Sequence, residues 1–450
     1  MLSRLKNSKY LPFLFFAVVM AVFHVTATAK FGDDIIFMTR KPLQDGLIAM
    51  NVDIYHNCSS RMFIFPTMVA LSLAPICIWR VLDLCMWLML AVSISKLFAK
   101  SDETSSNWFA VALIMLYPHW HMATAGWIST TTNFTWPLAF GLFALLTIKR
   151  LWEGVRLSAY RWALFVVAVL YSSDAEQALM ILFLVFAVLA MHLVYIRGTA
   201  PLQYRNTIFC VLSFLIVRLI FTLTAPGNYV RRLAGHYTVP EFEGYSIWQI
   251  GLLSFELTII HYVQFTLALF PLFAIFLMII VWNQHKNPFK RGISAIPLAI
   301  STIMSANMAV DALRFASQYL DQYKGQFLDG FILMSIPSWT GSNFLFILFF
   351  ASLLYTLYLS CSNNIDRCRI IGIMTLGFSS QLVLGLSSSL YGSALRTFIY
   401  ACFAIIACAL ILYENGAKAY IGRTSKILLA MACCANFVIT FIVSIVRMRL

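Results

Sequence analysis

Two adjacent carboxylates lie near the start of the chain, where they could serve as an acid or a base. Asp33 and Asp34 come within about one helical turn of the end of the apolar run 11–29. Carboxylates this close together repel each other, and a place at the membrane boundary removes part of their hydration. The pKa of one of them should therefore rise towards the range of a general base. The alternative interpretation is a solvated helix end.

A second group combines indole rings, hydroxyls and an amide between residues 118 and 137. Flat indole rings can stack on the C–H faces of a sugar, while hydroxyl and amide groups bond its OH groups. The candidate sugar-binding or acceptor-binding residues of this group are Trp127, Thr130, Asn133 and Trp136. An interfacial aromatic belt is the simpler explanation of the tryptophans. It does not explain the polar run 129–133 at the start of an apolar segment.

A third group is acidic. Asp174 and Glu176 occupy the six-residue connection 172–177 between two apolar runs. So short a connection keeps both carboxylates close to one face of the membrane. They could bind an acceptor or a cationic group there.

Arginines beside an apolar run form a fourth group. Arg231 and Arg232 follow the run 206–225 after a short loop that contains Asn228. A guanidinium group makes forked contacts with phosphate oxygens, and the end of an apolar run lies at the depth of a lipid phosphate. For either arginine alone, anchoring to lipid headgroups is the alternative.

Two further arginines are placed differently. Arg218 falls inside an apolar run, where an ionisable group is costly and usually functional. Arg314 stands three residues after Asp311, a spacing that favours a simple ion pair on a helix. His119 and His121 resemble half of a metal site, but no third ligand stands at a fixed spacing. We therefore expect neither a metal nor a cofactor.

The composition indicates which elements must position these groups. The chain has 450 residues, of which 61% are apolar and 11% charged, against roughly 45–50% and about 25% in soluble domains. A soluble enzyme, a disordered tail and a secreted disulfide scaffold are excluded. We expect an all-α polytopic membrane protein, a single transmembrane domain over residues 1–450 with about 11–13 transmembrane helices. The first long outer loop, 30–76, should also contain helices at the membrane surface.

The net charge of +14 is explained by orientation in the membrane and needs no nucleic-acid partner. Lys and Arg ahead of the first apolar run, and in the loops 149–161 and 286–291, place those parts in the cytoplasm. The loops assigned to the opposite side are 30–76, 118–132, 172–177, 226–261, 312–341 and 387–396. Most candidate residues gather on or near that outer side. The C-terminal Arg447 and Arg449 do not fit, because the same count places them outside.

Together these groups favour transfer of a sugar from a polyprenyl phosphate to a hydroxyl acceptor just outside the bilayer. Such a transfer needs a carboxylate base, a cation for the departing phosphate and a surface for the sugar. All three are predicted on one side of the membrane. A nucleotide-sugar enzyme would instead need a soluble nucleotide-binding domain, and the sequence contains none.

The chain resembles the GT-C superfamily of polytopic glycosyltransferases, and within it the serotype-converting O-antigen glucosyltransferases of enteric bacteria and their phages. The resemblance rests on Asp33-Asp34 after the first helix, on the segment 126–133, and on Ala225-Pro226-Gly227-Asn228 followed by Arg231. It implies an active site facing the periplasm in the bacterial inner membrane. It also implies an undecaprenyl-phosphate-linked glucose donor, a lipid-linked O-antigen acceptor, and a base at Asp33 or Asp34. The chain departs from many superfamily members because no substantial C-terminal periplasmic domain is visible.

From these features we expect an inverting glycosyltransferase in which Asp33 or Asp34 takes the proton of the acceptor. The residues expected to hold the donor phosphate are Arg231, Arg232, Arg218 and Arg314. The expected partners besides donor and acceptor are membrane lipids, with a donor flippase and a donor synthase acting upstream. The competing interpretations are a transporter or flippase of lipid-linked sugars, which should show internal repeats, an O-antigen polymerase, and a membrane acyltransferase.

Overall fold

The computed structural model describes residues 8–27, 32–39, 46–100, 103–195, 200–234, 244–266, 268–319, 342–385 and 395–447. Within these ranges the chain forms helices and no strand. Helices satisfy every backbone N–H and C=O internally, as an apolar surrounding requires. The prediction of an all-α membrane protein is confirmed at this level.

Among the described residues, five helical segments are long and apolar enough to cross a membrane. They are Ile76–Phe98, Trp127–Trp152, Glu176–Tyr195, Leu202–Thr224 and Leu395–Glu414. Further apolar helices have 10–17 residues, and the expected number of eleven to thirteen spans stays a prediction.

The described residues form two compact units. Unit 1 is drawn from Met1–Phe98 and Met122–Glu243, and unit 2 from Ala99–His121, Gly244–Leu386 and Ser393–Leu450. Each unit is assembled from segments that are far apart in the sequence.

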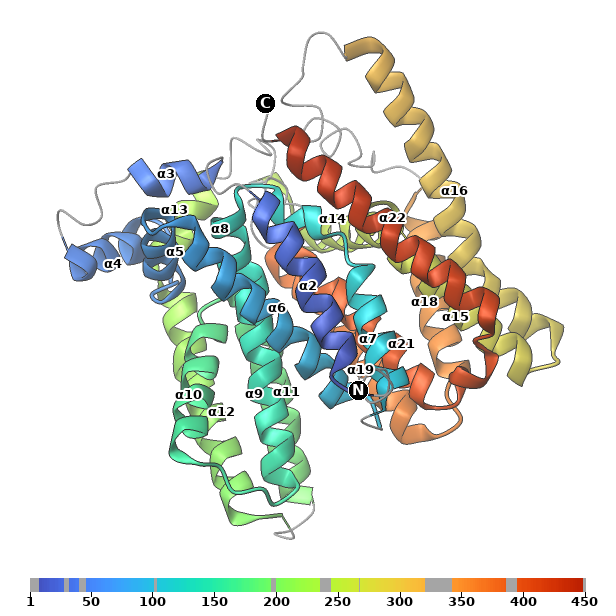
Figure 1. Ribbon diagram of the computed structural model, residues 1–450, viewed down its shortest axis with the longest axis horizontal. Coiled ribbons are helices and arrows are strands. Elements are labelled where there is room, and N and C mark those ends of the chain that lie inside the picture. The colour runs from blue at the N-terminus through green and yellow to red at the C-terminus, as the bar shows by residue number, and fades with distance from the viewer. Residues whose placement is uncertain are drawn as a thin grey trace. The chain divides into compact units, whose positions relative to one another are not determined.

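Unit 1 contains long helices and short ones. The long helices are α2 (Leu11–Thr26), α6 (Ile76–Phe98), α9 (Trp136–Trp152), α10 (Ala159–Ser172), α11 (Glu176–Tyr195) and α12 (Leu202–Thr224). The short ones are α3 (Asp33–Thr39), α4 (Gly46–Asn57), α5 (Ile64–Leu73), α8 (Trp127–Thr130), the π-helical turn η2 (Thr131–Thr135) and α13 (Pro226–Ala234). Figure 1 shows the short helices gathered at one end of the bundle formed by α9 to α12.

The core of unit 1 lies between α9, α10, α11 and α12, where apolar side chains from all four helices are buried together. The segment Trp127–Trp152 runs through α8, η2 and α9 without a break, and Pro137 stands in it directly after η2. Proline has no N–H to donate to the preceding turn, and the Thr132 carbonyl oxygen there accepts from the Tyr171 hydroxyl at 3.1 Å. The π-helical turn in the middle of the segment widens the helix by one residue, a feature that often marks functional sites.

Unit 2 is also helical throughout its described residues. Its helices are α7 (Thr104–Met115), the 3₁₀ turn η1 (His119–Ala123), α14 (Ile247–Ile260), the π turn η5 (His261–Phe265), α15 (Leu269–Gln284), α16 (Pro288–Tyr319), α18 (Ser342–Leu359), α19 (Asn364–Gly385), α21 (Ile399–Glu414), the 3₁₀ turn η6 (Ala417–Tyr420) and α22 (Arg423–Arg447). Helix α21 is its centre, since nearly every side chain from Ile399 to Tyr413 is buried.

A hydrogen-bonded histidine–aspartate pair buried among the apolar helices of unit 1 connects α2, α6 and α9. His24 Nε2 lies 2.8 Å from Asp83 Oδ2, and Trp136 Nε1 donates to Asp83 Oδ1 at 2.7 Å. His24 Nδ1 donates to the Met20 carbonyl oxygen at 2.7 Å. Both ionisable side chains are almost fully buried, and each polar atom of the pair has a partner.

Removing one member of this pair should destabilise the protein more than removing both. Asp83→Leu leaves His24 and Trp136 without an acceptor in an apolar surrounding, and we expect a loss of about 3–5 kcal/mol in the free energy of unfolding. The double variant His24→Phe/Asp83→Leu should recover the part of that loss that comes from His24, while Trp136 Nε1 still lacks its acceptor. Thermal unfolding of the purified protein in detergent measures both, with Cys85→Ala on the exposed face of α6 as the control. Equal losses for the single and the double variant would contradict this account.

Candidate functional site

The Asp34 side chain caps the N-terminus of α8. Its side chain is fully buried, with Oδ1 accepting the Ser129 N–H at 2.8 Å and Oδ2 accepting the Ile128 N–H at 3.2 Å. Gly126, with φ +104°, permits this approach, because a Cβ there would lie 2.5 Å from Asp34 Oδ1. Asp34 thus supplies the N-terminal cap that α8 otherwise lacks.

The two aspartates at the start of α3 have different surroundings. Burial raises the pKa of Asp34 from 3.8 to about 6, against the opposing effect of hydrogen bonds from Ser129 and Ile128; the charge of Asp33 adds a smaller rise. Asp33 is half-buried, and its backbone N–H donates to the Ala125 carbonyl oxygen at 2.9 Å. Of the two carboxyls, that of Asp33 is therefore the more accessible to another molecule.

Stability should depend on pH through Asp34. In the folded protein the pKa of Asp34 lies above its ordinary value of 3.8. The stabilisation that comes from its protonation is therefore complete below about pH 3.8 and is lost as the pH rises through about 6. Between about pH 4 and about pH 7.5, the free energy of unfolding of the unmodified protein should fall by up to about 3 kcal/mol more than that of Asp34→Asn. Chemical denaturation of both proteins in detergent over this range measures the difference. Parallel pH profiles would show that Asp34 does not bind its proton more tightly in the folded state.

Asp174 and Arg218 hold the start of α5 in place. The carboxylate of Asp174 accepts three consecutive backbone N–H groups, those of Met62 at 2.9 Å and of Phe63 and Ile64 at 2.8 Å. The guanidinium group of Arg218 donates to Asp174 and also to the Ser60 carbonyl oxygen at 2.8 Å.

The pairing of Asp174 with Arg218 changes what these two residues can do. Both side chains are buried and occupied with each other and with backbone groups. The sequence analysis assigned Asp174 to the acceptor and Arg218 to the donor phosphate. In the structure these bonds make both residues position the start of α5, and their assignment to the acceptor and the donor phosphate stays a prediction.

Glu176 lies between two guanidinium groups. Arg61 donates from Nε to Glu176 Oε2 at 2.9 Å and from Nη1 to Asn133 Oδ1 at 2.7 Å. Arg231 Nη2 donates to Glu176 Oε1 at 3.3 Å, and its side chain is 31% exposed. Two cations face one carboxylate, which leaves a local excess of positive charge beside an exposed guanidinium group. Such a place suits a phosphate.

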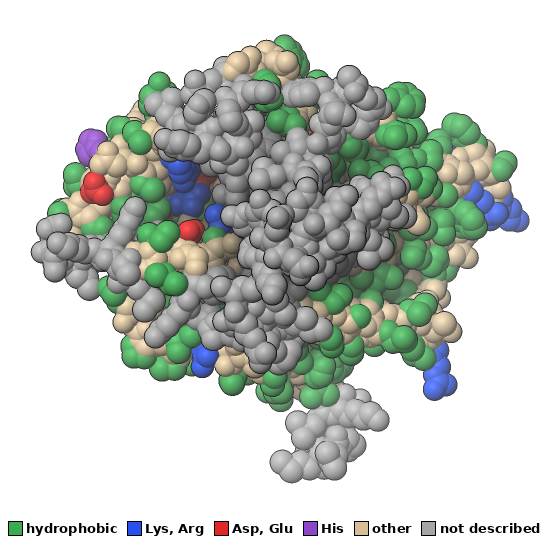
Figure 2. All heavy atoms as spheres, turned by 90° about the horizontal axis from the view of Figure 1, so that it is seen from above, with side chains coloured by type: hydrophobic (Ala, Val, Ile, Leu, Met, Phe, Trp, Pro, Cys, Tyr) green, Lys and Arg blue, Asp and Glu red, His purple; other side chains and the backbone are tan. Residues whose placement is uncertain are grey.

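A continuous set of hydrogen bonds connects Asp34 with Arg61 and Arg231. The backbone N–H of Ser129 donates to Asp34, and the Ser129 carbonyl oxygen accepts from Asn133 Nδ2 at 2.6 Å. Asn133 Oδ1 then binds Arg61, which reaches Arg231 through Glu176. We call these residues, together with Asp33 beside Asp34 and the pair of Asp174 and Arg218, the charged end of unit 1; its members are Asp33, Asp34, Arg61, Asn133, Asp174, Glu176, Arg218 and Arg231. Figure 2, seen from the end at which α3 lies, shows Lys or Arg side chains beside an Asp or Glu side chain.

The two tryptophans assigned to sugar binding are enclosed by the protein. Trp127 is 2% exposed and lies edge-on to Phe23, while Trp136 is 4% exposed and donates to Asp83. Neither ring offers a face to a sugar, because both connect α9 or α8 with the neighbouring helices. Thr130 is buried as well, and its Oγ1 has no hydrogen-bond partner among the described residues.

Asn228 fixes the start of α13 against the end of α12 and against Ser60. Its Nδ2 donates to the Thr222 carbonyl oxygen at 2.8 Å and lies 3.4 Å from Ser60 Oγ. Gly227 allows the close approach, since a Cβ there would lie 2.5 Å from the backbone nitrogen of Cys58. Asn228 thereby positions the helix that carries Arg231. The side chains of Arg232 and Arg314 lie outside the described residues.

Sequence reasoning missed three residues that the structure brings into prominence: Arg61, His24 and Asp83. Arg61 is the last residue of the polar stretch before α5, so its place in the first outer loop was the available signal. His24 and Asp83 are ionisable residues inside apolar runs, which is itself a signal.

Among the described residues, no group of three or more His, Cys, Asp or Glu side chains could hold a metal ion. The chemical groups at the charged end are therefore carboxylates, guanidinium groups, one amide and the backbone around α8. Comparison of the chain with family models, with curated proteins and with solved structures finds no match.

Proposed function

We propose that the chain is an inverting glycosyltransferase that moves a hexose, such as glucose, from undecaprenyl phosphate to lipid-linked O-antigen. The transfer takes place at the charged end of unit 1, on the periplasmic side of the bacterial inner membrane. The observation that carries the proposal is the hydrogen-bonded connection from Asp34, the neighbour of Asp33, to Arg231 through Ser129, Asn133, Arg61 and Glu176.

The proposal assigns the base to Asp33. An acceptor hydroxyl can reach a half-buried carboxylate more readily than the enclosed one of Asp34, which is also bound to the start of α8. Asp33 takes the proton as the acceptor oxygen bonds to the anomeric carbon of the sugar. Asp34 acts as a positioning residue, because it holds α8 and the backbone of α3 together.

The departing group is polyprenyl phosphate, whose negative charge grows as the bond between the anomeric carbon and the phosphate oxygen breaks. Arg231 is the exposed cation of the charged end and stabilises that charge. Glu176 holds Arg231 in place and is itself held by Arg61. A fixed, partly desolvated guanidinium group is more effective than a mobile one, since less reorganisation accompanies the reaction.

Analysis of lipopolysaccharide from cells with and without this chain tests the proposal. We expect O-antigen repeats that are heavier by one hexose, with a linkage that is absent from cells lacking the chain. Unchanged repeat mass with slower export of lipid-linked sugars would indicate a transporter. Unchanged repeat mass with a different chain-length distribution would indicate a polymerase. Either result would overturn the assignment.

A further inference from the structure

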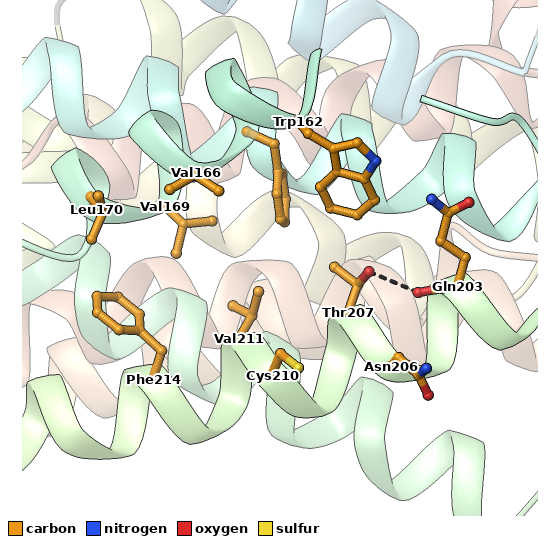
Figure 3. Close-up of a pocket in the computed structure, with 11 residues that line it drawn as sticks. Trp162, Val166, Val169, Leu170, Gln203, Asn206, Thr207, Cys210, Val211 and Phe214 are labelled. Carbon is orange, nitrogen blue, oxygen red and sulfur yellow. Dashed lines mark hydrogen bonds between the residues drawn. The ribbon is translucent and has the colours of Figure 1, made fainter. Parts of the chain in front are cut away.

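A groove lies on unit 1 between α10 and α12, and its lining runs from Trp162 and Gln203 to Leu170 and Phe214. It encloses a volume of about 460 Å³, within the range of roughly 300–1,000 Å³ found for small-molecule sites. Its walls are mostly apolar: Trp162, Val166 and Val169 from α10, and Cys210, Val211 and Phe214 from α12. Figure 3 shows these side chains directed towards one another from the two helices.

The groove has one polar end. Gln203, Asn206 and Thr207 line it near the start of α12, opposite Trp162 near the start of α10. From Gln203 to Phe214 the helix rises about 16 Å, which is about half of the roughly 30 Å hydrocarbon core of a bilayer. The groove therefore has the length of one leaflet, with its polar end at the membrane surface.

That polar end favours a negative charge. Arg161 and Arg205 stand in the first turns of α10 and α12, just beyond the lining of the groove, and among the described residues neither forms a salt bridge. Arg161 Nε donates to the Tyr160 hydroxyl at 3.0 Å and keeps its charge. Both helices begin there without a side-chain cap, so their first N–H groups and the positive ends of their dipoles lie at the same end. Basic pockets between membrane helices are typical binding places for anionic lipid headgroups.

We propose that the groove between α10 and α12 binds one glycerophospholipid with an anionic headgroup. One acyl chain lies along Val166, Val211 and Phe214, and the phosphate lies beside Arg161 and Arg205. The apolar lining accounts for a hydrocarbon chain, and the single-leaflet length accounts for its being an acyl chain. The positive charges of Arg161 and Arg205, which no carboxylate among the described residues neutralises, account for the negative sign of the headgroup. A polyprenyl chain is longer than this groove, and a donor phosphate at Arg231 would lie at the opposite end of unit 1.

Two neighbouring valines of α10 make a matched test. Val166 and Val167 are 50% and 49% exposed, but only Val166 lines the groove. The full chain, purified in detergent and freed of lipid, is titrated with dioleoylphosphatidylglycerol while its melting temperature is followed. Val166→Trp should raise the half-saturating lipid concentration at least tenfold, whereas Val167→Trp should leave it unchanged.

The headgroup is tested with charge variants and with other ligands. Arg205→Gln should raise the half-saturating lipid concentration about fivefold. Lys290→Gln on unit 2 should leave it unchanged. A zwitterionic lipid with the same chains should bind less tightly than phosphatidylglycerol, and glycerol phosphate alone should produce no shift. Equal responses of Val166→Trp and Val167→Trp would overturn the proposal. So would a stronger shift with undecaprenyl phosphate than with phosphatidylglycerol, which would assign the groove to the donor lipid, or full stabilisation by glycerol phosphate, which would assign it to a free anion.

Discussion

Replacing Asp33 with asparagine should lower the rate of sugar transfer by about 10²–10⁴-fold, because it removes the group that takes the acceptor proton. Asparagine has nearly the same shape and keeps the start of α3, so folding and membrane insertion should be retained. The rate is measured with purified protein, a polyprenyl-phosphate hexose and a lipid-linked saccharide acceptor. Asp33→Glu should recover part of the activity, since it keeps a carboxylate at an altered distance.

Two further variants distinguish the base from its surroundings. Asp53→Asn changes an exposed carboxylate in the same outer loop, on α4, and should leave the rate unchanged. Asp34→Asn should have a smaller effect than Asp33→Asn, because the amide oxygen can still accept the Ser129 N–H. If Asp34→Asn abolished transfer while Asp33→Asn did not, the two roles assigned here would be exchanged. If transfer survived both changes at the original rate, neither aspartate would be the base.

Replacing Arg231 with glutamine should lower the turnover number by about 10²–10³-fold, because the growing charge of the departing phosphate loses its nearest exposed cation. Arg231→Lys should retain part of the rate, since it keeps the charge but loses the forked geometry. The melting temperature should change little, because Arg231 is partly exposed and Glu176 keeps its bonds to Arg61.

The control for Arg231 is Arg156→Gln, in the exposed loop between α9 and α10. It removes the same charge at the far end of the helices and should not alter transfer. A turnover number for Arg231→Gln within a factor of two of the original would contradict the phosphate-binding role. A large fall in melting temperature for Arg231→Gln would instead show that the residue acts through the fold.

The sequence predicted the class of fold and the neighbourhood of the site, but not the pairing inside it. Composition alone gives an all-α membrane protein, because 61% apolar residues cannot be covered in a soluble fold. The alternation of basic and less basic loops placed Asn133, Glu176 and Arg231 on one side, and the structure brings these three together through Arg61. Arg61 could not be chosen from the sequence, since its partner Glu176 is 115 residues away.

The residues that the structure shows in a structural role share one property: their burial. Asp174, Arg218 and Trp136 were singled out because charged and aromatic groups near a membrane face are often functional. In the structure each one forms hydrogen bonds with a buried polar group of another segment. A sequence does not reveal which polar groups will be buried opposite one another. The π-helical turn η2 is similarly invisible, because the extra residue changes the register by which Asn133 faces Arg61.

Transfer in a defined system tests the central claim most directly. Purified protein in liposomes is supplied with polyprenyl-phosphate hexose labelled in the sugar and with a lipid-linked saccharide acceptor, and the products are separated and weighed by mass spectrometry. The account predicts an acceptor heavier by one hexose and free polyprenyl phosphate in equal amount, both lost in the double variant Asp33→Asn/Arg231→Gln. Label that crosses the membrane while still attached to its lipid, or transfer that persists in the double variant, would contradict it.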